Sequence, residues 1–184
     1  MKFRQICFLL SVLAFLSCAS LDTGRYYDDK SCCFISNYPQ FKVQIKDKSA
    51  KPVETNMKIT DNYAFTTNKG AIIIEILTLP HRNMDYYYPD EAIVSNLRGV
   101  PIGIESFNDK NWVRAVFFLE GNRIQTSYFR RQDKYLLGVS YSEHHPEQSS
   151  HVENYKKTLK LSQDLEDQIE KQFATANSTF EILE

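Results

Sequence analysis

Glycine is scarce in this sequence, since its 184 residues contain only six. A Gly-rich loop that cradles phosphate needs several glycines close together, and the chain has little material for one. It also lacks a Gly-x-Ser-x-Gly nucleophile elbow and a His-Glu-x-x-His zinc helix. We therefore predict no cofactor, and no local motif marks a catalytic residue.

An excess of positive charge is also missing. The chain has 22 Lys and Arg side chains against 23 Asp and Glu. Removal of residues 1–17 would take away Lys2 and Arg4 but no acid, leaving 20 basic against 23 acidic side chains and a formal charge of −3. A mildly acidic protein offers no basic surface for a phosphate backbone. We expect no nucleic acid among its partners.

The longest apolar run lies at the amino terminus and is too short for a membrane span. Lys2 and Arg4 precede the run Ile6–Leu16, which the small residue Ser17 follows. A helix needs about 20 apolar residues to cross the hydrocarbon core. A charged start, a short apolar middle and a small-residue exit are instead typical of a secretory signal, so we interpret residues 1–17 as a signal peptide.

The stretch Phe15-Leu16-Ser17-Cys18 resembles the lipobox of bacterial lipoproteins, in which the signal is cut immediately before a cysteine that receives the lipid. The resemblance covers residues 1–20 and implies acylation of Cys18, with palmitate among the chains. Leu, Val or Ile is usual where Phe15 stands, and a residue smaller than Leu16 is commoner, so an ordinary cleavable signal stays open. The non-acidic Ala19 implies sorting to the outer membrane, with the body facing the periplasm or the cell surface.

The chain has only three other cysteines. Cys7 lies in the signal, which leaves the adjacent pair Cys32-Cys33. Because redox sites normally space their cysteines as Cys-x-x-Cys, we interpret this pair as small residues near a strand start or as one bridge to a partner chain. A strained disulfide between neighbours is the alternative. We assign residues 18–35 to a lipid-anchored tether and residues 36–184 to a single domain.

Alternation and aromatic content predict a body rich in β-strands. The 11 Tyr and 12 Phe suit a pleated, half-buried surface. Phe41–Lys46 alternates apolar with polar residues, and Gly70–Leu77 is a strong, central strand. The other predicted strands are residues 56–59, 62–66, 101–107, 112–120, 123–130 and 135–141. The last three form an antiparallel meander, because Gly121-Asn122 and Gln132-Asp133 suit tight turns.

Two segments have helical patterns. Residues 89–99 place acids first, apolar residues at helical spacing and Gly99 at the end, which predicts a short capped helix. Leu161, Leu165, Ile169 and Phe173 follow at intervals of four and line one face of a second helix, with Ser162 as a candidate cap. Residues 152–161 are either helical or an extended arm. The fold class we predict is α+β: an antiparallel sheet of about six to eight strands with these helices packed on it.

The order of strands, short helix, meander and final amphipathic helix ending in Phe173 resembles the PsbP-like fold of extracytoplasmic lipoproteins and photosystem-associated subunits. The resemblance covers residues 40–174 and implies a binding or assembly role. A Trp usually found early in that family is missing, since the single Trp112 lies in the meander. The resemblance therefore transfers no functional residue.

Histidines supply the candidate metal site. Glu143-His144-His145 precedes His151 and Glu153, and these residue types bind first-row metals. The metal hypothesis names His144, His145 and His151 as ligands. The alternative is a solvated loop, because adjacent side chains such as His144 and His145 point apart in an extended chain.

Tyr86-Tyr87-Tyr88 is the candidate binding loop, since three consecutive tyrosines cannot all lie on one buried face and Tyr is favoured in recognition surfaces. Its alternative is a loop pinned to the domain edge. Arg130-Arg131 suggests either a solvated turn or an anion site. We favour a membrane-anchored binding or assembly module for a protein or small ligand. The competing hypothesis is an extracytoplasmic hydrolase or metal-dependent enzyme whose site is assembled from distant residues.

Overall fold

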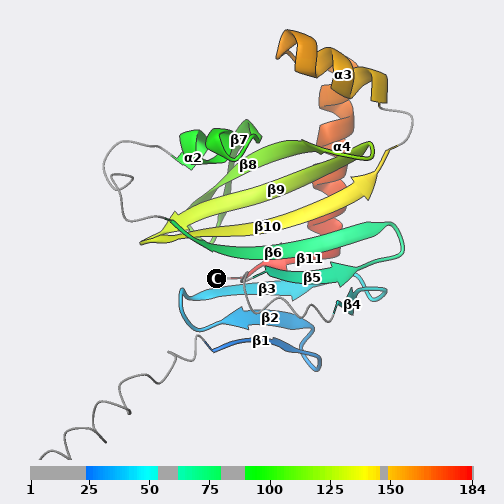
Figure 1. Cartoon of the computed structure of the whole chain (residues 1–184). Helices are drawn as coiled ribbons and strands as arrows, with labels where there is room; N and C mark the ends of the chain where they lie inside the picture. Colours follow the sequence, from blue (N-terminus) through cyan, green and yellow to red (C-terminus); the bar gives the residue numbers. More distant parts are fainter. Residues whose placement is uncertain (1–23, 54–61, 80–89, 146–148, 184) are drawn as a thin grey trace, which may run out of the picture.

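The computed structural model describes residues 24–53, 62–79, 90–145 and 149–183, which form two antiparallel sheets with helices against them (Figure 1). The predicted α+β class is confirmed. The larger sheet has seven strands, in the order β4 (Lys51–Pro52), β5 (Asn62–Thr66), β6 (Gly70–Thr78), β10 (Tyr135–His144), β9 (Arg123–Gln132), β8 (Lys110–Leu119) and β7 (Val100–Phe107). The smaller sheet has four, in the order β1 (Arg25–Asp28), β2 (Cys33–Ser36), β3 (Phe41–Ile45) and β11 (Phe180–Ile182).

The second sheet corrects the expected architecture, which had one sheet and a tether over residues 18–35. Strands β1 and β2 fall within or across that tether and pair with each other, and β2 also pairs with β3. The reason is the apolar stretch at the start of β2: Phe34 is fully buried and lies 4.5 Å from the ring of Tyr63. The sheet-forming part of the chain thus begins at Arg25 rather than at residue 36.

Three helices complete the described fold: α2 (Asp90–Asn96), α3 (Ser149–Thr158) and α4 (Gln163–Thr179). The predicted cap of α4 is confirmed, because the Ser162 side chain accepts a hydrogen bond from the Leu165 amide at 3.3 Å. Residues up to Thr158 of the ambiguous segment are helical. None of the helices in the described ranges is long and apolar enough to cross a membrane.

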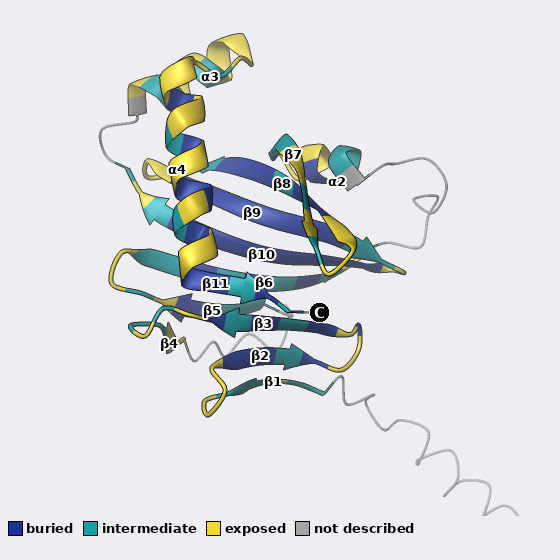
Figure 2. Cartoon of the chain, turned by 180° about the vertical axis from the view of Figure 1, so that it is seen from behind, coloured by how far each residue is buried: buried dark blue, intermediate teal, exposed yellow. Residues whose placement is uncertain are grey.

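Both faces of the larger sheet are covered. Helix α4 turns its buried residues toward one face while its outer side stays exposed (Figure 2). On the other face, Ile93 and Val94 of α2 pack in a separate cluster with Val113 and Phe129. This double cover explains why the middle of β9 is buried at every position instead of at alternate ones.

The two sheets share one core. Trp112 of β8 is fully buried, and its ring stacks on Phe41 of β3 with centroids 5.7 Å apart. Tyr128 of β9 meets the ring of Phe173 from α4 at 5.5 Å. The predicted meander is confirmed as β8, β9 and β10. The strand predicted at residues 56–59 lies outside the described residues.

Candidate functional site

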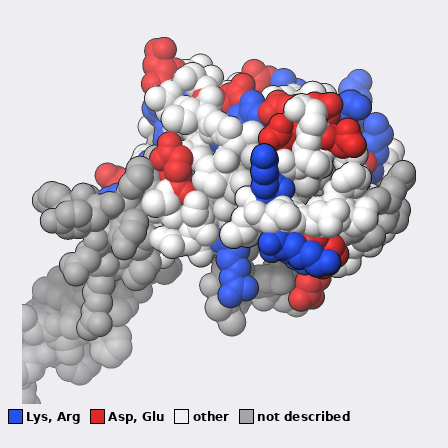
Figure 3. All heavy atoms as spheres, turned by 90° about the horizontal axis from the view of Figure 1, so that it is seen from above, with Lys and Arg blue, Asp and Glu red and all other residues white. Residues whose placement is uncertain are grey.

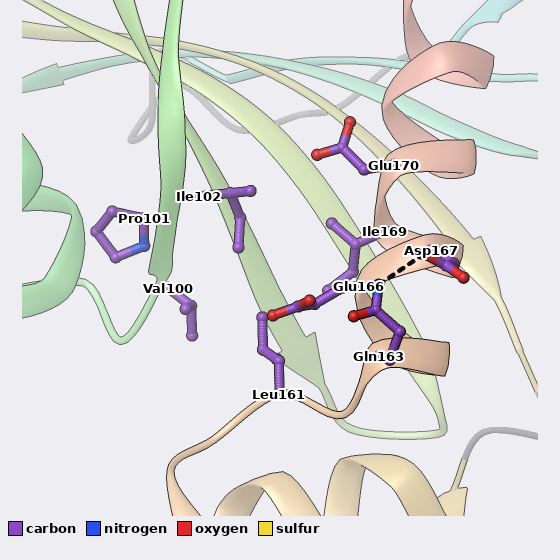
Figure 4. A pocket seen from close by; sticks show the side chains of 9 residues that line it. All are labelled: Val100, Pro101, Ile102, Leu161, Gln163, Glu166, Asp167, Ile169 and Glu170. Carbon is purple, nitrogen blue, oxygen red and sulfur yellow. Dashed lines mark hydrogen bonds between the residues drawn. The ribbon is translucent and has the colours of Figure 1, made fainter.

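A cavity of about 440 Å³ lies between edge strand β7 and the first half of α4. Val100, Pro101 and Ile102 line it from β7, while Leu161 and Ile169 line it from the helix side (Figure 4). In Figure 2, the edge strand β7 bends forward from its own sheet, on the side of the sheet where α4 lies. The apolar side chains share these walls with polar ones from α4, namely Gln163, Glu166, Asp167 and Glu170.

Three carboxylate residues, Glu166, Asp167 and Glu170, line this cavity, and their side chains point in different directions. Glu166 points into it beside Leu161, whereas Asp167 points away and accepts a hydrogen bond from Gln163 at 3.1 Å (Figure 4). Within the described part of the chain, neither Glu166 nor Asp167 forms an ion pair with Lys or Arg. Seen from above, this end of the molecule carries both acidic and basic side chains, and several of the acidic ones lie close together (Figure 3). The cavity thus has apolar side chains and a negative charge to offer a ligand.

An ion bridge links the cavity's two walls. Arg114 of β8 forms salt bridges with Glu105 of β7 at 3.2 Å and with Glu170 of α4. Its guanidinium lies 4.4 Å from the ring centroid of Phe173. Burial alone would lower the pKa of Arg114, but the Glu170 and Glu105 carboxylates raise it overall, so the bridge stays charged. Glu170 is thereby engaged, and Glu166 is left to meet a ligand.

Two exposed apolar residues lie close in sequence to residues that line this cavity. Ile104 of β7 is 60% exposed, and Leu159, two residues before Leu161, is 78% exposed. Leu159 also has a φ of 51°, which lies in the left-handed region that favours glycine. A leucine that is both exposed and conformationally unfavourable is not placed there for stability.

We expect Leu159→Gly to raise the free energy of unfolding by about 0.5–1 kcal/mol, because glycine adopts this conformation without a steric penalty. Leu159→Ala is the matched control, since it removes the same apolar surface but keeps a Cβ at positive φ. Chemical denaturation of both variants checks this. Equal stability of the glycine and alanine variants would contradict the expectation.

Only two of the three predicted metal ligands line the same cavity. His145 and His151 both line a second, polar cavity of about 520 Å³, with Glu143, Lys171 and Gln172, but His144 does not line it. The imidazole of His145 instead contacts the Gln172 side chain. Among the described residues no group of three His, Cys, Asp or Glu side chains is placed to hold a metal ion. The metal site therefore stays a hypothesis without a described ligand set.

The other predicted candidates have separate outcomes. Tyr86, Tyr87 and Tyr88 lie outside the described residues. Arg130 is buried in β9 with its guanidinium 5.3 Å from the Trp112 ring centroid, so the solvated-turn interpretation is wrong for it. Cys32 is an exposed free thiol and Cys33 a buried one, which fits the interpretation of small residues at a strand start.

The tyrosine with the clearest environment has a structural role. Burial raises the pKa of Tyr128 to about 12, and its hydroxyl donates to the Asn177 side chain at 2.9 Å. The ring packs between Phe107 of β7 and Phe173 of α4. Tyr128 therefore fixes the spacing of the two elements that form the first cavity.

Comparison with solved structures finds distant likeness. No family model matches the chain, and no curated protein matches it. The fold is similar to that of a cyanobacterial PsbP. That solution structure, of CyanoP from Synechocystis sp. PCC 6803, shares 12% identity and a TM-score of 0.42, over 86% of this chain and 91% of that chain. It agrees with the PsbP-like resemblance of pattern, and at this distance it carries no argument about function.

Sequence reasoning missed the β7–α4 cavity. Glu166 is one of several acids on α4, and an acid on an amphipathic helix usually lies on its solvated side. Val100 and Ile102 looked like ordinary strand residues. The signal that existed was Leu161, which continues the apolar stripe of Leu165 and Ile169 beyond the start of α4 at Gln163.

Proposed function

We propose that this chain is a lipid-anchored, extracytoplasmic binding module that holds a cationic, partly apolar segment of a partner protein between β7 and α4. The observation that carries the proposal is the Glu166 carboxylate beside the apolar side chains of the cavity, without an ion-pair partner among the described residues. A Lys or Arg side chain complements this site, because its stem packs on Ile102 and Leu161 while its charge meets Glu166.

The lipid-anchored, extracytoplasmic location in this proposal is inferred from residues 1–18, which lie outside the described residues. Its support is the signal-like amino terminus and the lipobox-like sequence ending at Cys18. A lipid on Cys18 would hold the domain at a membrane surface, where its diffusion toward a partner segment is confined to two dimensions. Binding is preferred to catalysis because the cavity places the Glu166 carboxylate beside apolar side chains, while the Glu170 carboxylate is engaged by Arg114 and the Asp167 carboxylate by Gln163.

Glu166→Gln tests the proposal. We expect this variant to bind the peptide Val-Lys-Val-Lys-Val-Lys-Val, acetylated at one end and fluorescein-labelled at the other, about tenfold more weakly than wild type. The loss follows from removing the charge that meets the lysine while keeping the side chain's shape. Fluorescence anisotropy at low salt gives the dissociation constants.

Asp167→Asn is the matched control, since Asp167 also lines the cavity but turns its carboxylate away from β7 and toward Gln163. It removes the same charge from the same helix, so a general electrostatic attraction would weaken both variants equally. A peptide with glutamate in place of lysine should not bind. Equal affinities of wild type and Glu166→Gln for the lysine peptide would overturn the proposal.

A further inference from the structure

The seven-stranded sheet has one edge long enough to accept another strand. Its two edge strands are β4 and β7. Strand β4 has two residues, Lys51 and Pro52, which are a charge and a residue without a backbone donor. Both features protect an edge from further pairing. Strand β7 has eight residues and pairs with β8 alone.

The backbone groups on the open side of β7 follow from its register. Asn108 and Asp109 both have positive φ, and they connect the pair Phe107 and Lys110 as a two-residue turn. The pair that closes such a turn is hydrogen-bonded, and hydrogen-bonded pairs alternate along an antiparallel ladder. Ile104 therefore falls in a non-hydrogen-bonded pair with β8.

Ser106 falls in the same class as Ile104, as its register partner is Asn111. The N–H and C=O groups of both residues point away from β8. No strand within the described ranges pairs with that side of β7. These two residues therefore present four backbone hydrogen-bonding groups at an open edge.

The side chains of β7 leave this edge accessible. A Cβ built on Gly103 would meet nothing within 4 Å, and Ile104 is 60% exposed. The β-bulge between Pro101 and Gly103 is confined to the start of the strand. An exposed edge with an apolar side chain and no lysine is the kind that accepts an extended peptide.

We propose that the partner is an extended polypeptide segment that adds to β7 as an eighth strand and places a Lys or Arg in the cavity beside Glu166. This mode rests on the proposed function, which it deepens by fixing the backbone conformation of the bound segment. One wall of the cavity and the open edge belong to the same strand. Val100, Pro101 and Ile102 line the cavity. Ile104 and Ser106 carry the open backbone groups. Backbone pairing supplies affinity, and the charge supplies selectivity.

Two N-methylated isomers of the Val-Lys heptapeptide test the mode. One carries N-methyl groups on its lysines, the other on its internal valines. An added strand directs only alternate N–H groups at β7. When all the lysines face α4, the N–H groups that reach β7 belong either to the lysines alone or to the valines alone, according to the direction of the strand. We expect one isomer to bind at least tenfold more weakly than the unmethylated peptide and the other to bind within about threefold of it.

A protein variant gives the reciprocal test. Ile104→Pro removes the outward N–H but no hydrogen bond to β8, and an edge strand tolerates such a proline. Ile104→Val keeps the N–H and is the control, and thermal melts followed by circular dichroism establish that both fold. We expect the proline variant to bind the unmethylated peptide at least tenfold more weakly and the valine variant to bind within about twofold of wild type.

The possible outcomes separate the two proposals. Equal binding of both isomers, or an equal loss in both, overturns strand addition, and an unchanged affinity of a folded Ile104→Pro variant does the same. If Glu166→Gln still weakens binding in those cases, the proposed function stands without this mode. If wild type does not bind the lysine peptide, both proposals are overturned.

Discussion

Replacing Cys18 with alanine is expected to abolish membrane attachment of the mature protein in a bacterial host. Each buried methylene contributes about 0.8 kcal/mol to membrane binding, so two or three acyl chains make the anchor effectively stable and their loss removes it. The variant should be soluble after processing at another site, or should keep its signal peptide. Membrane fractionation and intact mass check this, and wild type should show cleavage before Cys18 with the added mass of the lipid.

Cys7→Ala is the control for this experiment, because Cys7 lies within the predicted signal and is removed with it. That variant should fractionate with the membrane and have the same mature mass as wild type. A wild-type protein that is cut elsewhere and released without a lipid would contradict the expectation. The search for partners would then move from membrane extracts to soluble ones.

Trp112→Ala is expected to lower the free energy of unfolding by about 3–5 kcal/mol. Trp112 is fully buried, stacks on Phe41 of the other sheet and lies under the Arg130 guanidinium. The truncation leaves a cavity where the two sheets meet, and the arginine loses its aromatic partner. Urea denaturation followed by circular dichroism measures the change, because the single Trp is no longer available as a fluorophore.

Trp112→Phe is the informative partner variant. The indole N–H is buried without a hydrogen-bond partner among the described residues, so phenylalanine removes an unsatisfied donor and keeps an aromatic ring against Phe41. We expect it to cost about 1–2 kcal/mol, well below the alanine variant. Equal losses for the two variants would show that the stacking with Phe41 contributes little to stability.

Local patterns in the sequence predicted most of the larger sheet. Alternation identified β3, and the apolar-rich stretch Gly70–Leu77 indicated a strong, central strand, which the place of β6 between β10 and β5 confirms. The spacing of Leu165, Ile169 and Phe173 indicated the buried face of α4. These signals succeed because burial on a single element repeats with the period of that element.

The second sheet was missed because its pairing is non-local. Strand β2 has four residues, and β11 has three, so neither has enough length to show a period. What fixes them is contact with partners far along the chain, such as Phe180 of β11 opposite Ile45 of β3. Polar residues around β1 made that stretch resemble a tether. Short edge strands are generally decided by tertiary contacts rather than by propensity.

The candidate cavity could not be found from residue types alone. Glu166 and Asp167 are neighbours of the same charge on one helix, and only the angle between helix and strand gives them different roles. The histidines are also close in sequence, yet His144 does not line the cavity that His145 and His151 share. Residue types suggest a chemistry, and the fold decides which of them share a space.

The pairing of β11 with β3 also bears on export. Helix α4 leads directly into β11, which supplies the fourth strand of a sheet whose other members lie near the amino terminus. A chain threaded through a membrane from its amino terminus, as residues 1–17 imply, cannot complete this sheet until residues 180–182 have crossed. If the chain is exported in this way, the smaller sheet would be completed only on the far side of the membrane.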